Sequence, residues 1–204
     1  MLKIRQIAKS KTVVCYKKKD KMNVVILNGD IRQGKSDFSA YLEKLAEEFR
    51  LNHTVQLFQL NKMNLHYCTG CWSCWWKTPG RCAINDDAEE IFKSVINSDF
   101  FIFASPLIAG FTSSELKKIT DRLIVLLHPY IEIRNGENHH RKRYNNYPDF
   151  GLILEKETDT DNEDLEIVND IYDRFAINFH CKKRYMKFIE HDKVEEIVYE
   201  TCNI

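Results

Sequence analysis

Three short runs of consecutive apolar residues constrain the fold of this chain more than any other feature. They lie at residues 24–27, 100–104 and 152–154. Strands that are covered on both faces of a parallel sheet have this composition, whereas strands with one face in water alternate apolar and polar residues. We therefore expect three central strands of a parallel sheet.

The segments around these runs predict the rest of the fold. Residues 55–60 and 185–189 alternate in polarity and predict two edge strands. Between the strands, apolar side chains recur at helical spacing, so each connecting segment can cover a face of the sheet. These side chains are Phe38, Tyr41, Leu42, Leu45 and Phe49, then Ile91, Phe92 and Val95, then Leu116, Ile119, Leu123 and Leu127, and finally Leu165, Val168, Tyr172, Phe175 and Phe179.

Strands that alternate with helices predict an α/β fold. The expected architecture is a flavodoxin-like, three-layer, doubly wound parallel sheet of five strands in the order 2-1-3-4-5. Two long connections, residues 61–85 and 129–149, remain outside these elements, and loops of that length are usually functional or mobile. We expect residues 1–21 to form an N-terminal extension and residues 22–204 to form one domain.

Composition limits the partners and the surroundings that we expect. The chain carries 30 basic and 30 acidic side chains, so no overall field attracts nucleic acid or an anionic membrane. No apolar run approaches the roughly 20 residues that a membrane helix needs. Seven cysteines without a recognisable secretory signal indicate a reducing compartment. We therefore expect a cytoplasmic protein that binds neither nucleic acid nor membrane.

The segment from Gly29 to Ser36 is a candidate phosphate-binding loop. It follows the first predicted strand and precedes the first predicted helix, where loop N–H groups and the positive end of a helix favour an anion. An ordinary strand-to-helix turn is the alternative without a function. The candidate cofactor-binding residues of this loop are Gly29, Asp30, Arg32, Gly34, Lys35 and Ser36.

The same loop also matches the pattern G-x-x-x-x-G-K-S of nucleoside-triphosphate enzymes. In that interpretation Lys35 contacts phosphates and Ser36 binds magnesium. Such enzymes usually also need an acidic residue at the end of a second buried strand, and the strand that ends near Ser105 has none. A nucleoside-triphosphate-dependent phosphotransferase remains the alternative enzyme.

Four cysteines form the second candidate site. Cys68, Cys71, Cys74 and Cys82 follow the spacing C-x2-C-x2-C-x7-C, in which the three closely spaced thiolates can converge on one cluster. The compact run suits iron and sulfur better than zinc, which more often uses two separated pairs. A 4Fe-4S cluster is the favoured interpretation. Reduced thiols in a cluster-free flavin enzyme, zinc and a disulfide are the alternatives.

These blocks together resemble the flavodoxin-like NAD(P)H-dependent FMN reductase family, and within it the iron-sulfur flavoproteins. The likeness runs in the family's order through residues 23–34, 68–87 and 98–122. It implies that the loop after the first strand holds the FMN phosphate. It also implies that the following segment runs along the isoalloxazine ring, which adds Ser105, Pro106, Leu107, Ile108, Ala109 and Gly110 to the candidate cofactor-binding residues.

The resemblance implies an FMN-dependent NAD(P)H oxidoreductase or electron-transfer flavoprotein. NAD(P)H would be the co-substrate, the electron acceptor a small molecule or a protein, and the assembly a homo-oligomer. Because a flavin accepts hydride itself, we expect no catalytic acid or base. A non-enzymatic, metal-binding scaffold of the same fold is a further alternative.

Three positions depart from the family's pattern. Asp30 and Asp37 stand where the family commonly has Ser and Thr, and Ile108 stands where an aromatic residue often lies against the flavin. Two carboxylates therefore approach a site for a phosphate, and like charges at short distance repel each other.

Overall fold

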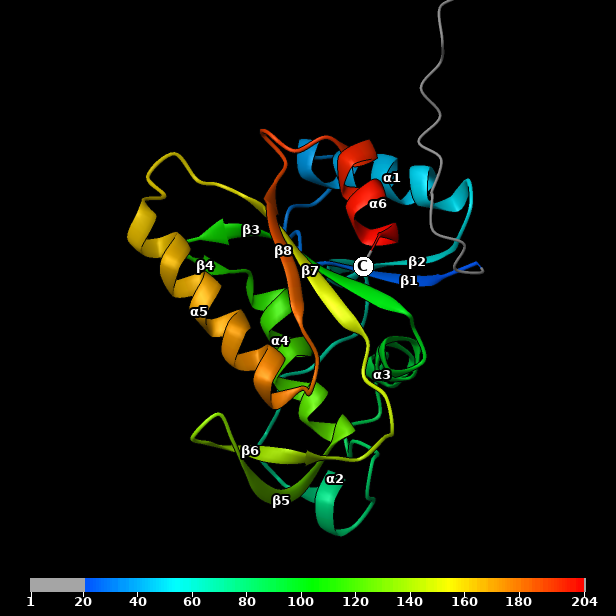
Figure 1. The fold of residues 1–204 in the computed structure, drawn as a ribbon, viewed down its shortest axis with the longest axis vertical. Helices are drawn as coiled ribbons and strands as arrows, with labels where there is room; N and C mark the ends of the chain where they lie inside the picture. The colour runs from blue at the N-terminus through cyan, green and yellow to red at the C-terminus, as the bar shows by residue number, and fades with distance from the viewer. Residues whose placement is uncertain (1–20, 204) are drawn as a thin grey trace, which may run out of the picture.

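The central sheet has the predicted strand order. The computed structural model describes residues 21–203. Residue 204 and all but the last residue of the predicted N-terminal extension, residues 1–21, therefore lie outside the described residues. Five parallel strands lie side by side (Figure 1). In spatial order they are β2 (Thr54–Gln59), β1 (Asn23–Asn28), β3 (Phe100–Ile108), β7 (Asp149–Glu155) and β8 (Lys183–Phe188). This is the order 2-1-3-4-5 expected from the sequence.

Helices cover both faces of the sheet. On one face lie α1 (Asp37–Arg50) and α6 (Val194–Cys202), and on the other lie α3 (Ala88–Ile96), α4 (Ser114–Arg122) and α5 (Asn162–Asn178) (Figure 1). Along β1, Val24 and Ile26 pack toward α1, while Val25 and Leu27 pack toward α3 and α4. Because successive strand residues face opposite sides, a strand covered twice must be apolar at every position.

Two features add to the predicted architecture. The short strand β4 (Phe111–Thr112) pairs antiparallel with the end of β3. Strands β5 (Leu127–Arg134) and β6 (Glu137–Lys142) form a separate antiparallel hairpin, seen below the sheet in Figure 1. The hairpin occupies most of the segment 129–149, for which the sequence predicts a long connection without regular structure.

The predicted third helix is too long. Its apolar series runs from Leu116 to Leu127, but α4 ends at Arg122. A 3-10 turn, η2 (Leu123–Leu126), follows, and Leu127 already begins β5. All of these leucines are buried, so their spacing reports burial rather than a continuous helix. The connection 61–85 contains two short helices. At its start lies η1 (Leu60–Lys62), and near its middle lies α2 (Ser73–Trp76).

Among the described residues, no helix has both the length and the apolar character that crossing a membrane requires.

Candidate functional site

A cavity opens at the carboxyl ends of β1, β3 and β7. Its volume is about 450 Å³, and it brings Ile31 and Arg32 of the loop after β1 next to Pro106, Leu107 and Ile108 at the end of β3. The segment 155–159 after β7 forms the remaining wall. A second cavity of about 530 Å³ shares Ile31 and Ile108 with the first and extends between α4 and α5. Four of the residues that the sequence predicts for FMN line the first cavity: Arg32, Pro106, Leu107 and Ile108. The other predicted residues are not among those that line it, namely Gly29, Asp30, Gly34, Lys35, Ser36, Ser105, Ala109 and Gly110.

The start of the loop is fixed to its neighbours at Gly29. The N–H group of Gly29 donates to the carbonyl of Ala104 over 2.8 Å, and its own carbonyl accepts from the hydroxyl of Ser113. Ser113 also caps α4, since its Oγ accepts from the N–H group of Leu116. A side chain at position 29 would lie 2.8 Å from Leu116 Cβ and from Ser113 Oγ. Only glycine fits here.

Asp30 is the buried centre of the loop, with 1% of its surface exposed. Its Oδ1 accepts from the backbone N–H group of Arg32 over 3.1 Å and from Arg32 Nε over 2.7 Å. Its Oδ2 accepts from the hydroxyl groups of Ser36 and Ser39. Burial alone raises the pKa of Asp30, but these hydrogen bonds outweigh burial and hold the pKa below its usual value. Asp30 is therefore a carboxylate at neutral pH.

The backbone of the loop keeps the properties of an anion site. Within the part of the chain that the structure describes, the N–H groups of Gln33, Gly34 and Lys35 donate to no protein acceptor. These groups precede α1, whose positive end favours an anion, and the side chain of Lys35 is exposed beside them. Asp37 is exposed in the first turn of α1 and takes no part in the hydrogen bonds around Asp30. The backbone N–H groups of the loop thus fit a phosphate. The side-chain donors Arg32, Ser36 and Ser39, however, already donate to Asp30.

The segment at the end of β3 is held by hydrogen bonds of its own. Ser105 is buried; its Oγ accepts from the N–H group of Ser113 and donates to the carbonyl of Pro106, so it positions the segment. The N–H group of Ala109 donates to Glu157 over 2.8 Å. Ala109 and Gly110 have φ angles of 51° and 77°, a left-handed pair that turns the chain into β4.

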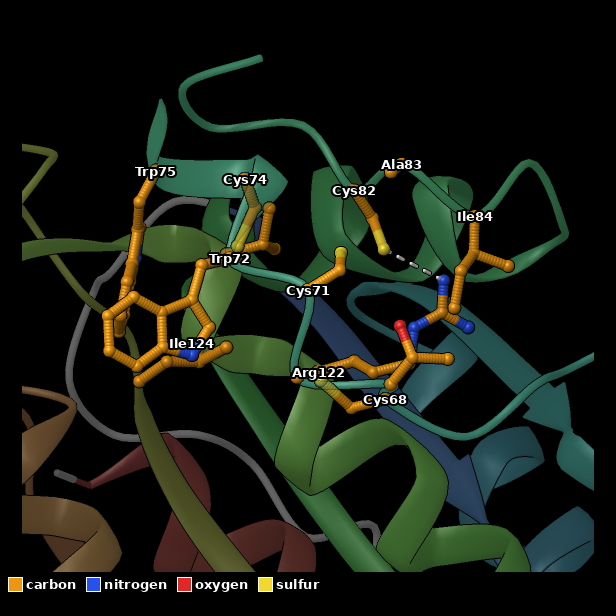
Figure 2. A pocket seen from close by; sticks show the side chains of 13 residues that line it. Cys68, Cys71, Trp72, Cys74, Trp75, Cys82, Ala83, Ile84, Arg122 and Ile124 are labelled. Carbon is orange, nitrogen blue, oxygen red and sulfur yellow. Dashed lines mark hydrogen bonds between the residues drawn. The ribbon is translucent and has the colours of Figure 1, made fainter. Parts of the chain in front are cut away.

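The four cysteines of the motif line a third, smaller pocket of about 170 Å³, the cysteine pocket (Figure 2). Cys68 and Cys71 are exposed, while Cys74 and Cys82 are half-buried. Burial and the neighbouring thiols raise the pKa of Cys74. In residues 21–203, however, no group of three or more His, Cys, Asp or Glu side chains is arranged to hold a metal ion. The structure gathers the thiols around one space without bringing them to ligand distance.

Arg122 also lines this pocket, and no motif of the sequence assigns it a role. Its guanidinium makes two hydrogen bonds to Asp86, of 2.7 Å and 2.9 Å, and both side chains are buried. It also donates to the carbonyl of His66 over 3.1 Å and to Cys82 Sγ over 3.4 Å, the bond dashed in Figure 2. Its face lies over the ring of Phe92. Arg122 therefore ties the cysteine segment to α3 and α4.

The ion pair predicts a pH dependence of stability. Burial raises the pKa of Asp86, but hydrogen bonds from Arg122 and the backbone of His66 outweigh it and lower the pKa to about 2. Because an unfolded aspartate titrates near a pKa of about 3.9, the pair stabilises the fold fully above about pH 4. This stability, about 2–3 kcal/mol, is lost as the pH falls toward 2.

Urea denaturation between pH 5 and pH 2, roughly the window in which this carboxylate gains its proton, tests the ion pair. The free energy of unfolding of the wild type should fall more steeply over this window than that of Asp86→Asn, which cannot titrate at this position. Equal slopes in the two proteins would contradict the assignment.

The cavity at the strand ends and the cysteine pocket lie at opposite ends of α4. The helix begins next to Ser113, which holds the loop after β1, and ends with Arg122 in the cysteine pocket. Nine helical residues span about 13 Å. The candidate flavin site and the cysteine pocket are thus separate sites joined by one rigid element.

Comparisons with known proteins agree with this arrangement. Residues 22–144 match the sequence profile of the family described as NADPH-dependent FMN reductase. An iron-sulfur flavoprotein of Clostridioides difficile is 30% identical over 126 residues, which cover 57% of this chain and 55% of that protein. An iron-sulfur flavoprotein of Methanocaldococcus jannaschii is 36% identical over 81 residues, which cover 40% of this chain and 39% of that protein. The chain thus matches about half or less of the length of these relatives.

Solved structures share the fold. An azoreductase of Bacillus anthracis superposes with a TM-score of 0.59 at 15% identity, covering 89% of this chain and 95% of the azoreductase. The apo form of an NADH:FMN oxidoreductase gives a TM-score of 0.56 at 11% identity, with 90% and 87% covered. Identities this low show a common fold and nothing more. Because the family profile matches more than half of the chain, this protein belongs to the NADPH-dependent FMN reductase family.

Proposed function

We propose that this protein is an FMN-dependent NAD(P)H oxidoreductase. The observation that supports this most directly is the cavity at the carboxyl ends of the strands, which joins the loop after β1 to residues 106–108. Ligands of doubly wound sheets bind at this edge. When bound, FMN accepts hydride from NAD(P)H and passes electrons on, so the protein supplies binding and orientation.

In this proposal the cofactor reaches from the loop after β1, beyond the residues that line the cavity, to the end of β3. The N–H groups of Gln33, Gly34 and Lys35 would hold the phosphate, with the charge of Lys35 beside them. Pro106, Leu107 and Ile108 would lie along the flavin ring and exclude water from one of its faces. In the phosphotransferase alternative Ser36 would bind magnesium, but the hydroxyl of Ser36 donates to Asp30.

A 4Fe-4S cluster on Cys68, Cys71, Cys74 and Cys82 is part of the proposal. Four thiolates are the usual donor set of such a cluster, and these four surround one pocket. The two relatives described above are both iron-sulfur flavoproteins by name. Binding requires the segment 68–82 to close further around the cluster than it does here.

A homo-oligomer is also part of the proposal. Trp76 and Ile133, which are 73% and 78% exposed, are candidate residues for the contact between subunits. We further propose that the protein works in the cytoplasm and passes electrons to a small-molecule or protein acceptor.

Anaerobic reduction tests the proposed function. The protein is saturated with FMN and separated from free flavin, and NADPH or NADH is then added without oxygen. We expect the visible absorption of the bound flavin to disappear, and to return when an electron acceptor is added. A protein that binds no flavin but binds ATP with magnesium would support the phosphotransferase instead. Bound flavin that neither nucleotide reduces would exclude an NAD(P)H oxidoreductase.

A further inference from the structure

We infer that Asp30 determines the flavin specificity of this site, so that it binds riboflavin, which lacks the phosphate, about as tightly as FMN. The inference rests on the proposed function, because it assumes that a flavin occupies the cavity at the strand ends. It concerns the loop after β1, where the carboxylate of Asp30 accepts from the side-chain donors of Arg32, Ser36 and Ser39 and leaves a phosphate only the backbone N–H groups.

The first argument is the supply of hydrogen-bond donors. A serine hydroxyl has a single proton to donate. The hydroxyl of Ser36 donates to Asp30 Oδ2, and the hydroxyl of Ser39 donates to the same oxygen over 3.0 Å. Neither serine can donate to a phosphate while these bonds exist. The loop therefore offers a phosphate its backbone N–H groups but not its hydroxyl groups.

The second argument is charge. The guanidinium of Arg32 binds Asp30 through Nε and Nη2 and also binds Glu155, so one cation already serves two carboxylates. Asp30 is almost fully buried and cannot turn away into water. A phosphate at this loop would meet a fixed negative charge, with only Lys35 as an uncommitted cation of the loop.

The third argument is that the ring end of the cavity does not depend on Asp30. Pro106, Leu107 and Ile108 belong to β3, and their backbone is fixed by pairing with β7 and β4. Apolar contact with a flavin ring is the same for riboflavin and FMN, since the two molecules differ only at the phosphate. The ring should therefore supply most of the binding free energy for both.

Fluorescence titration of the flavin-free protein tests this inference. The wild type should bind riboflavin and FMN with dissociation constants that agree within about tenfold. Asp30→Ser, which frees the loop donors, should bind FMN at least about tenfold more tightly and leave riboflavin within about threefold. If Asp30→Ser does not fold, Asp30→Asn, which removes the charge but keeps the shape of the side chain, should also tighten FMN binding and leave riboflavin binding unchanged.

A matched control distinguishes the effect of the hydrogen bonds around Asp30 from the effect of removing any negative charge near the loop. Asp37→Asn removes one negative charge from the same loop region, at an exposed position outside the network around Asp30. It should leave both affinities unchanged. An equal gain for FMN in Asp37→Asn and Asp30→Ser would overturn the inference, as would a wild type that binds FMN more than about a hundredfold more tightly than riboflavin. A wild type that binds neither flavin would refute the proposed function itself.

Discussion

Replacing Arg122 with alanine is expected to lower the free energy of unfolding by about 3–5 kcal/mol, because it leaves the buried carboxylate of Asp86 without a charge partner. The exposed fractions of these two side chains are 1% and 0%, so water cannot take over the lost hydrogen bonds. The bonds to His66 and to Cys82 disappear as well. Urea denaturation at pH 7 measures the loss.

Two variants make this result specific. The double variant Asp86→Asn with Arg122→Met leaves no charge buried, so it should lose less stability than Arg122→Ala alone. Lys117→Ala removes another basic residue of α4, whose ion pair with Asp121 is exposed, and should change stability by less than about 0.5 kcal/mol. The account of the cysteine pocket is contradicted if Arg122→Ala is no less stable than Lys117→Ala.

Replacing Gly29 with alanine is expected to cost about 1–3 kcal/mol and to weaken flavin binding, because it forces overpacking at the point where the loop is anchored. The new Cβ would lie 2.8 Å from Leu116 Cβ and from Ser113 Oγ, and 3.1 Å from the carbonyl oxygen of Ala104. The neighbours belong to α4 and β3, which cannot move independently of the core. The loop itself must therefore shift away from the cavity.

A denaturation curve and a flavin titration together test this prediction. Gln33→Ala is the control, since Gln33 is exposed in the same loop and keeps its backbone N–H group. It should change neither stability nor affinity appreciably. Unchanged stability in Gly29→Ala would show that the loop is not anchored as described. Lost stability with wild-type flavin affinity would show that the loop does not position the flavin.

The sheet could be predicted from the sequence because its central strands are buried on both faces. All four residues of the run from Val24 to Leu27 pack into the core, two on each side of the sheet, so each of them must be apolar. The hairpin of β5 and β6 could not be found in this way, because only two residues of its strands, Leu127 and His139, are buried. Its one clear signal is Asn135-Gly136, with φ angles of 51° and 81°, a pair that favours a tight hairpin turn.

For the candidate site, the sequence predicts where the residues lie along the fold but not which groups their side chains contact. The position of Gly29 to Ser36 after a buried strand fixes where the loop lies, and the family resemblance supplies the segment at the end of β3. That Asp30 binds the hydroxyl groups of the loop depends on where its side chain points, which spacing does not reveal. Arg122 was likewise hidden, although an arginine one turn after Ile119 on a buried helix face indicates a buried partner.

The identity of the molecule that the native protein carries tests the central claim most directly. The protein is purified, its absorption spectrum is recorded, and the small molecule released on denaturation is identified by chromatography and mass spectrometry. We predict a visible flavin spectrum and up to one flavin released per chain, as FMN or riboflavin. A colourless protein that releases no flavin, and that binds neither FMN nor riboflavin when they are added, would contradict the account.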